Sequence, residues 1–124
     1  MVDATLLVCK YNNMPKVTRQ NATHHPREGV DAYYYQLPNI DGGTTVAYAE
    51  FTGEHGVRTA GERARIYYVL EGKGEIEIDG EKLEMNPEDV IAIPPHATYN
   101  LWPTDGILKV ILYLELLDVS KLPK

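Results

Sequence analysis

The sequence predicts an all-β protein, an antiparallel sandwich or barrel, and three observations support this fold class. Short stretches rich in β-branched and aromatic residues follow one another at hairpin spacing from residue 44 onward. Turn signals separate them, the clearest being Asp79-Gly80, a preferred dipeptide of tight hairpins. No segment shows the periodicity of an amphipathic helix longer than two turns. A chain of 124 residues accommodates one such domain with a single core.

The clearest strand patterns lie in the C-terminal two-thirds of the chain. Residues 74–78 alternate polar and apolar side chains, which is typical of a strand with one buried face. Residues 107–116 form an apolar run that is long enough for a strand buried on both faces. We expect strands at residues 44–51, 65–70, 74–78, 82–85, 90–93 and 107–116.

The first 43 residues have a less regular pattern. Strands are expected at residues 5–8 and 31–37, with an irregular polar stretch at residues 12–29 between them. Such an arm can wrap over a partner subunit or form a surface loop. We expect a single domain, with the N-terminal arm and strands at 1–43, a barrel core at 44–116 and a C-terminal tail at 117–124.

Charge and composition argue against several classes of partner. The formal net charge is −6, and Lys and Arg form no run, so we expect neither nucleic acid nor a membrane as a partner. No apolar run approaches the roughly 20 residues of a membrane span, and the N-terminal residues lack the layout of a secretory signal. The one cysteine, Cys9, cannot form an internal disulfide, which suits a reducing compartment. We therefore expect a cytoplasmic location.

Residues 53–103 resemble the two motifs of the cupin superfamily. The first motif is written G-x5-H-x-H-x(3,4)-E-x6-G, and here Gly53 opens it and Gly72 closes it. The second motif is written G-x5-P-x-G-x2-H-x3-N, and here DVIAI at residues 89–93 precedes Pro94. The segment between the motifs, residues 73–87, matches the short hairpin of the smallest members. The resemblance implies a jelly-roll barrel, also called a double-stranded β-helix.

The metal ligands of the family are replaced in this chain. In metal-binding cupins two histidines, a glutamate and a third histidine converge on one cation. Here the corresponding positions hold Thr59, Gly61, Arg65 and Tyr99, or Arg58 and Ala60 in place of the first two with the longer spacing. None of these side chains is an imidazole or a carboxylate, and a guanidinium repels a divalent cation. We therefore expect no metal and no cofactor in the barrel.

Four histidines lie outside these positions. His24 and His25 are adjacent, His55 precedes the first motif, and His96 occupies a turn position where the family has glycine. None shows the i, i+2 spacing that brings two imidazoles to one metal on a strand. Exposed or turn histidines are the simpler interpretation, and a relocated metal site made from them stays open.

The resemblance also predicts which side chains line the barrel. Arg65 replaces an inward-facing glutamate, so Tyr67 should face inward on the same strand. A buried guanidinium needs an anionic partner, which is either an internal carboxylate, with Glu50 as the first candidate, or a bound anion. The predicted ligand-binding residues are Arg65, Tyr67, Tyr99, Tyr48, Glu50, Arg58 and Leu101.

Three functions from different classes follow. The first is a metal-free small cupin that binds a small polar or anionic ligand, sugar-like or carboxylate, with Arg65 as its anchor. The second is a metal-independent isomerase or epimerase of a sugar-type substrate, with His96 and Tyr99 as catalytic residues. The third is a structural barrel that has a vestigial pocket. A small-molecule ligand and a second copy of the chain, forming a homodimer, are the expected partners.

Overall fold

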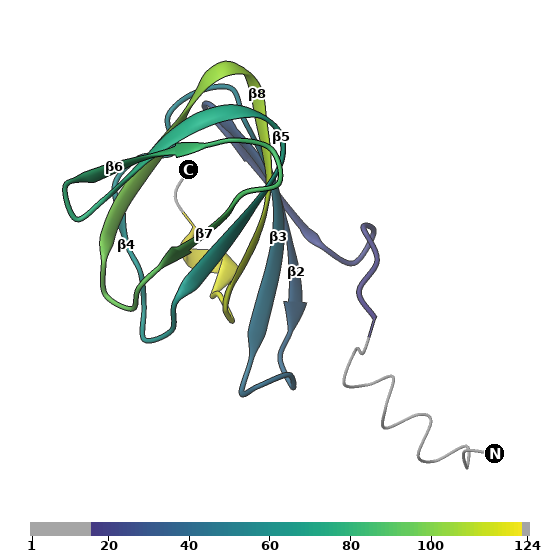
Figure 1. The fold of residues 1–124 in the computed structure, drawn as a ribbon. Helices are drawn as coiled ribbons and strands as arrows, with labels where there is room; N and C mark the ends of the chain where they lie inside the picture. Colours follow the sequence, from purple (N-terminus) through teal and green to yellow (C-terminus); the bar gives the residue numbers. More distant parts are fainter. Residues whose placement is uncertain (1–15, 123–124) are drawn as a thin grey trace, which may run out of the picture.

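The computed structural model describes residues 16–122, and most of these form β-strands (Figure 1). The strands are β1 (Thr23–Arg27), β2 (Val30–Leu37), β3 (Thr44–Phe51), β4 (Arg58–Thr59), β5 (Arg65–Ile78), β6 (Glu81–Met85), β7 (Val90–Ile93) and β8 (Thr98–Glu115). A single 3-10 turn, η1 (Val119–Lys121), follows β8. The predicted all-β class is confirmed. Among residues 16–122, no helix has the length and apolar character needed to span a bilayer.

The strands form one antiparallel sheet that curls into a barrel (Figure 1). Their order is β1-β2-β3-β8-β5-β6, while β4 also pairs with β8 and β7 with β5. The long strand β8 connects the barrel, because its C-terminal half lies between β3 and β5 and its N-terminal half pairs with β4 and β5. The neighbours of β8 are therefore distant in sequence, as in a jelly roll.

The structure extends two of the predicted strands. Residues 65–70 and 74–78 belong to one strand, β5, with an irregular register between Val69 and Gly74. Gly72 lies at this irregularity with a φ of 79°, a conformation that glycine adopts without strain. The predicted strand at 107–116 begins earlier, at Thr98. Gly72 and Gly106, both with positive φ, lie within these long strands and do not end them.

The N-terminal part differs more from the prediction. The stretch 12–29 was expected to be irregular, but Thr23–Arg27 forms β1, which pairs with β2. Pro26 weakens the strand pattern, and a proline is tolerated here because β1 lies at the edge of the sheet. The predicted strand at 5–8 lies outside the described residues.

The register of the sheet separates an inner face from an outer face. Tyr34, Ala47, Leu112 and Tyr67 are paired in one row across β2, β3, β8 and β5, and this row faces the core. The adjacent row faces outward and contains Tyr33, Tyr48, Ile111 and Tyr68. The alanines on β2 and β3 leave room inside the barrel for the tyrosines of β5 and β8.

Candidate functional site

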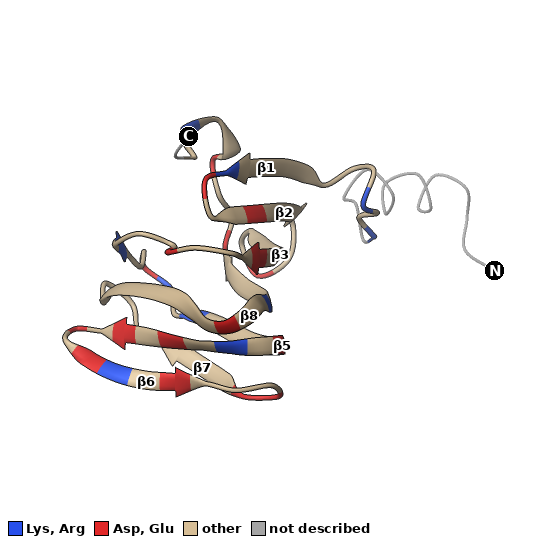
Figure 2. Ribbon diagram, turned by 90° about the horizontal axis from the view of Figure 1, so that it is seen from above, with Lys and Arg blue, Asp and Glu red and all other residues tan. Residues whose placement is uncertain are grey.

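A cavity of about 220 Å³ lies inside one end of the barrel. Strands β1, β2, β4, β5 and β8 contribute to its wall, together with the segment that follows β8. Four cationic side chains line it, Arg27, Arg58, Arg65 and Lys121, and no Asp or Glu of the described residues does. The protein carries a formal charge of −6, and Figure 2 shows acidic residues on β2, β3, β5 and β6. The cavity is therefore locally cationic within an acidic molecule.

Arg65 lies at the centre of this charge arrangement. Its side chain is 12% exposed, and it shares the inward face of β5 with Tyr67. Its Nη1 donates to the hydroxyl of Tyr99 at 2.7 Å, and its Nη2 donates to Oε1 of Glu115 at 2.8 Å. Burial alone would lower the pKa of Arg65, but the bond to Glu115 keeps that pKa above its ordinary value.

The internal partner of Arg65 is Glu115, not Glu50 as the sequence suggested. Glu50 lies on the outer face of β3 and accepts a hydrogen bond from the hydroxyl of Tyr48 at 2.7 Å. Burial and this bond raise the pKa of Tyr48 to about 12. Neither Tyr48 nor Glu50 lines the barrel, because the inward face of β3 carries Ala47 and Phe51. The alternation in residues 44–51 defined two faces but not which one points inward.

Two polar atoms of the Arg65–Glu115 pair have no partner. The Nε atom of Arg65 and the Oε2 atom of Glu115 are buried without a hydrogen bond to any described residue. The hydroxyl of Tyr67 is also buried and forms no hydrogen bond of normal geometry. Burial raises the pKa of Tyr67 well above its ordinary value, so this phenol stays neutral. Buried polar atoms without partners are costly, and this barrel contains three of them.

Arg27 and Arg58 carry positive charge that the described residues do not neutralise. Arg27 donates to the backbone carbonyl of His55 at 2.8 Å, and Arg58 donates to the carbonyl of Val57 at 2.8 Å. Neither forms an ion pair with a carboxylate in the described part of the chain. Burial and the charge of Arg58 lower the pKa of Arg27. The cavity therefore contains uncompensated cations.

His55 lines the same cavity, which the sequence did not reveal. Its backbone N–H donates to the carbonyl of Leu101 on β8 at 2.8 Å, and this bond holds the loop before β4 against the barrel. Its ring stacks on Tyr99, with centroids 5.5 Å apart and planes inclined by 28°. Burial lowers the pKa of His55 to about 4, and the positive charges of nearby arginines act in the same direction. His55 is therefore a neutral imidazole at pH 7.

The proposed proton-transfer pair, His96 and Tyr99, is not brought together. The side chain of His96 is 64% exposed, and its Nε2 lies 3.5 Å from Glu62. Tyr99 is 2% exposed and bonded to Arg65 inside the barrel. Leu101, the other predicted site residue from the second motif, is fully buried in the core.

The residues at the family's ligand positions do not fit a metal ion. Arg65 is a cation, and Tyr99 accepts its hydrogen bond. Within residues 16–122, no group of three or more His, Cys, Asp or Glu side chains is arranged to hold a metal. Of the other histidines, His24 is bonded to Asp31 and stacks on Tyr33.

Fold and sequence together define the class of protein. The closed antiparallel topology and the cavity at one end are those of a small cupin barrel. The Cupin domain family matches residues 49–113, just over half of the chain, and the chain belongs to this family. The uncharacterized protein MJ1618 of Methanocaldococcus jannaschii is 35% identical over 68 residues. This match covers 52% of the chain and 54% of the relative, so the chain spans about half of that relative's length.

Solved structures confirm the barrel topology. KdgF from Halomonas sp. is 19% identical and superimposes with a TM-score of 0.68, covering 83% of this chain and 94% of KdgF. The nucleoside dehydratase Pac13, known from Streptomyces, is 18% identical with a TM-score of 0.68, covering 85% of each chain. An RmlC-like cupin from Shewanella frigidimarina is 15% identical with a TM-score of 0.66, covering 86% of this chain and 94% of its own. At these identities the likeness concerns the fold.

Proposed function

We propose that this cupin binds a small anionic ligand, a carboxylate or sugar acid, inside its barrel without a metal. The observation that carries the proposal is the pair of uncompensated arginines, Arg27 and Arg58, in a cavity that no described carboxylate lines. Cations left partly desolvated without a partner are costly, so an anion that enters the cavity gains charge-assisted hydrogen bonds. Guanidinium groups suit a planar carboxylate or a phosphate by two-point contact.

The size of the cavity and the structural neighbours support a small ligand. At about 220 Å³ the cavity is smaller than the pockets that hold drug-sized molecules. Pac13, which has the same fold, has been solved with uridine, so a barrel of this kind can hold a body with a sugar ring. In this chain Tyr34, Tyr99 and Leu112 provide flat and apolar surfaces beside the cations.

The proposal is tested by titrating the full chain with malate, galacturonate and phosphate in a calorimeter. We expect at least one acid to bind, with affinity that falls as salt is raised. Arg27→Gln and Arg58→Gln should each weaken binding about ten-fold, equivalent to roughly 1.4 kcal/mol.

Arg19→Gln is the matched control, because it removes the same charge from the outer face, where Arg19 lies over the ring of Tyr33. This variant should bind as the wild type does. If none of the acids bind, or if the cavity variants bind as well as the control, the proposal is wrong.

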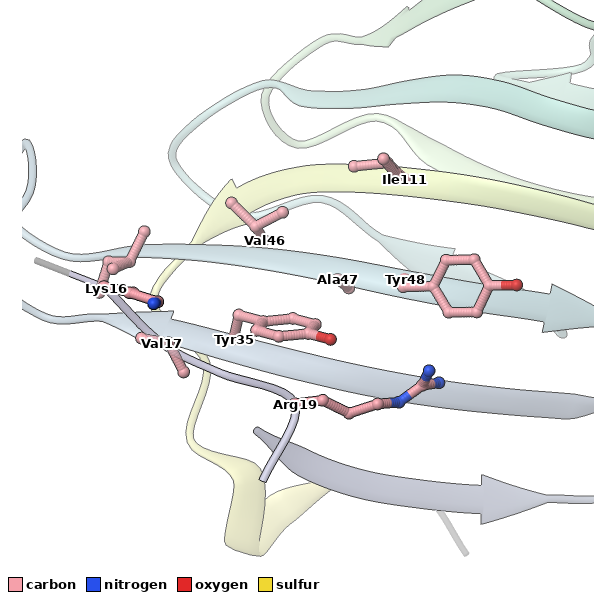
Figure 3. Close-up of a pocket in the computed structure, with 9 residues that line it drawn as sticks. Lys16, Val17, Arg19, Tyr35, Val46, Ala47, Tyr48 and Ile111 are labelled. Atoms are coloured by element: carbon pink, nitrogen blue, oxygen red, sulfur yellow. The ribbon is translucent and has the colours of Figure 1, made fainter. Parts of the chain in front are cut away.

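We also propose that the chain forms a homodimer through the outer face of its sheet. This face, defined by the outward residues of β2, β3, β8 and β5, exposes apolar side chains, among them Ile66, Tyr68, Leu70 and Ile111. Figure 3 shows Tyr35, Val46, Tyr48 and Ile111 on it, with Lys16, Val17 and Arg19 beside them. A contiguous apolar surface of this kind marks an interaction site.

A further inference from the structure

His55 offers the cavity a hydrogen-bond acceptor. Its Nδ1 lies 2.7 Å from the backbone carbonyl of Gly56. A carbonyl oxygen can only accept, so Nδ1 carries the proton and the neutral ring has its lone pair on Nε2. Nε2 forms no hydrogen bond to a described residue and is not one of the buried atoms without a partner, so it is accessible to solvent or to a ligand. Stacking on Tyr99 and a tilted contact with Phe51, whose ring centroid lies 5.8 Å away, hold the ring in place.

The other polar side chains around His55 are mainly donors. Arg27, Arg58 and Arg65 have guanidinium groups, and Lys121 has an ammonium group, none of which can accept. The hydroxyl of Tyr99 already accepts from Arg65 and keeps its own proton for donation. Among the side chains that line the cavity, a ligand therefore meets donors for an anionic group, and Nε2 of His55 as a group that can accept a hydrogen bond but not donate one.

A hydroxyl group on the ligand suits Nε2 of His55 better as a hydrogen-bond donor than an amine does. An ammonium group on the ligand would donate equally well to Nε2, but its charge would be repelled by Arg27, Arg58 and Arg65. A hydroxyl donates without adding positive charge. The donor must also lie close to the anionic group, because the arginines and His55 line one small cavity.

We infer that the ligand of this site is a hydroxy acid, whose carboxylate is held by Arg27 and Arg58 and whose hydroxyl donates to Nε2 of His55. The inference rests on the proposed anion site and adds a specificity-determining residue to it. His55 selects acids that carry a hydroxyl over acids that lack one, since only the hydroxyl replaces the solvent contact of Nε2 with a hydrogen bond inside the cavity.

Two pairs of acids that differ by a single hydroxyl test the inference, malate with succinate and lactate with propionate. Calorimetry on the full chain at pH 7 and constant ionic strength should show the hydroxy acid binding about five- to ten-fold more tightly in at least one pair. His55→Phe keeps an aromatic ring between Phe51 and Tyr99 but has no Nε2. It should reduce the preference to less than about two-fold and leave the binding of the acid without the hydroxyl nearly unchanged.

A second measurement does not depend on the variant. With ¹⁵N-histidine-labelled wild type, the resonance of the unprotonated Nε2 of His55 should shift on addition of the hydroxy acid and stay in place with its partner acid. Equal affinities within both pairs, with Nε2 unperturbed, would overturn the inference and leave the anion site standing. If no acid of either pair binds at millimolar concentration but galacturonate or phosphate does, the inference is refuted and the anion site stands. If none of these anions binds, both are refuted.

Discussion

At the scale of single residues, the site depends on groups whose ionisation the barrel controls. Arg65 is inside the barrel because it shares the inward face of β5 with Tyr67, and it is tolerated there because Glu115 and Tyr99 accept its hydrogen bonds. Removing one partner of a buried ion pair costs more than the pair contributes, since the other charge is left uncompensated. Arg27 and Arg58 lack such partners, so their charge is available to a ligand.

Neutral His55 makes the stability of the protein depend on pH. The unfolded chain protonates His55 near pH 6.5, whereas the folded protein does so only near pH 4. Because the pKa of His55 is lower in the folded protein, neutral His55 contributes fully to the free energy of unfolding above pH 6.5. This contribution is lost as the pH falls from 6.5 to 4. The full loss is about 3 kcal/mol, of which about 2 kcal/mol is reached at pH 5. Urea unfolding at pH 7 and pH 5 measures this loss of the free energy of unfolding.

The control for this prediction is a histidine in solvent. His96→Gln should keep the pH dependence of the wild type, because His96 is largely exposed. His55→Phe should be less sensitive to pH between 7 and 5 than the wild type. If the free energy of unfolding changed equally between pH 7 and pH 5 in His55→Phe and in the wild type, the pH dependence would not come from His55.

At the scale of elements, β5 persists through an irregularity because of one glycine. Gly72 has a φ of 79°, and a Cβ added there would lie 2.1 Å from the carbonyl oxygen of Ile107. Without a side chain, the backbone of β5 can pass close to β8 and resume pairing at Lys73. This close approach at Gly72 sets the register of Arg65 and Tyr67 relative to β8. The register in turn places both side chains inside the barrel.

Gly80 is the matched comparison for Gly72. It has a φ of 87° in the hairpin turn after β5, but an added Cβ would meet nothing within 4 Å. Gly80→Ala should cost only the strain of the left-handed backbone, about 1–2 kcal/mol. Gly72→Ala should lose the same free energy of unfolding from backbone strain, and about 1–3 kcal/mol more from the clash with the carbonyl of Ile107. Chemical denaturation of both variants measures the difference, and equal losses would show that the approach to Ile107 is not tight.

At the scale of the whole molecule, the two faces of the sheet differ in character. The inner face encloses the cationic cavity, and the outer face carries a row of paired apolar residues, Tyr48 on β3, Ile111 on β8 and Tyr68 on β5. A soluble monomer rarely leaves such a surface uncovered. This is the reason for proposing that a second copy of the chain covers it.

Substitution at the centre of that row tests the dimer. Light scattering with size exclusion should give the wild type twice the mass of one chain. Ile111→Glu places a charge in the row and should give a single-chain mass, with thermal stability recorded to show that the variant is folded. Val57→Glu, at a residue 62% exposed in the segment before β4, should remain a dimer. A wild type with the mass of one chain at all concentrations would rule out the proposal.

Much of the fold followed from local patterns in the sequence. Strand alternation, Asp79-Gly80 and the cupin-like spacing around Gly53 and Pro94 placed β3, β6 and β7. These features depend on residues close in the chain, where side-chain period and turn chemistry act directly. The same spacing placed Arg65 and Tyr99 at the positions of lost metal ligands, and the structure brings them within 2.7 Å of each other.

The composition of the cavity was decided by contacts between distant residues. Glu115 is the last residue of β8, and simple alternation places it on the opposite face from inward Leu114, so no pattern indicated that it pairs with Arg65. His55 enters the cavity through a backbone bond to Leu101, and Lys121 through the chain that follows β8. By itself the sequence determined the barrel and two residues at its centre, because these follow from strand periodicity and motif spacing. Only the tertiary structure decided which face of β3 points inward and which charges meet, because the curling of the sheet into a barrel sets both.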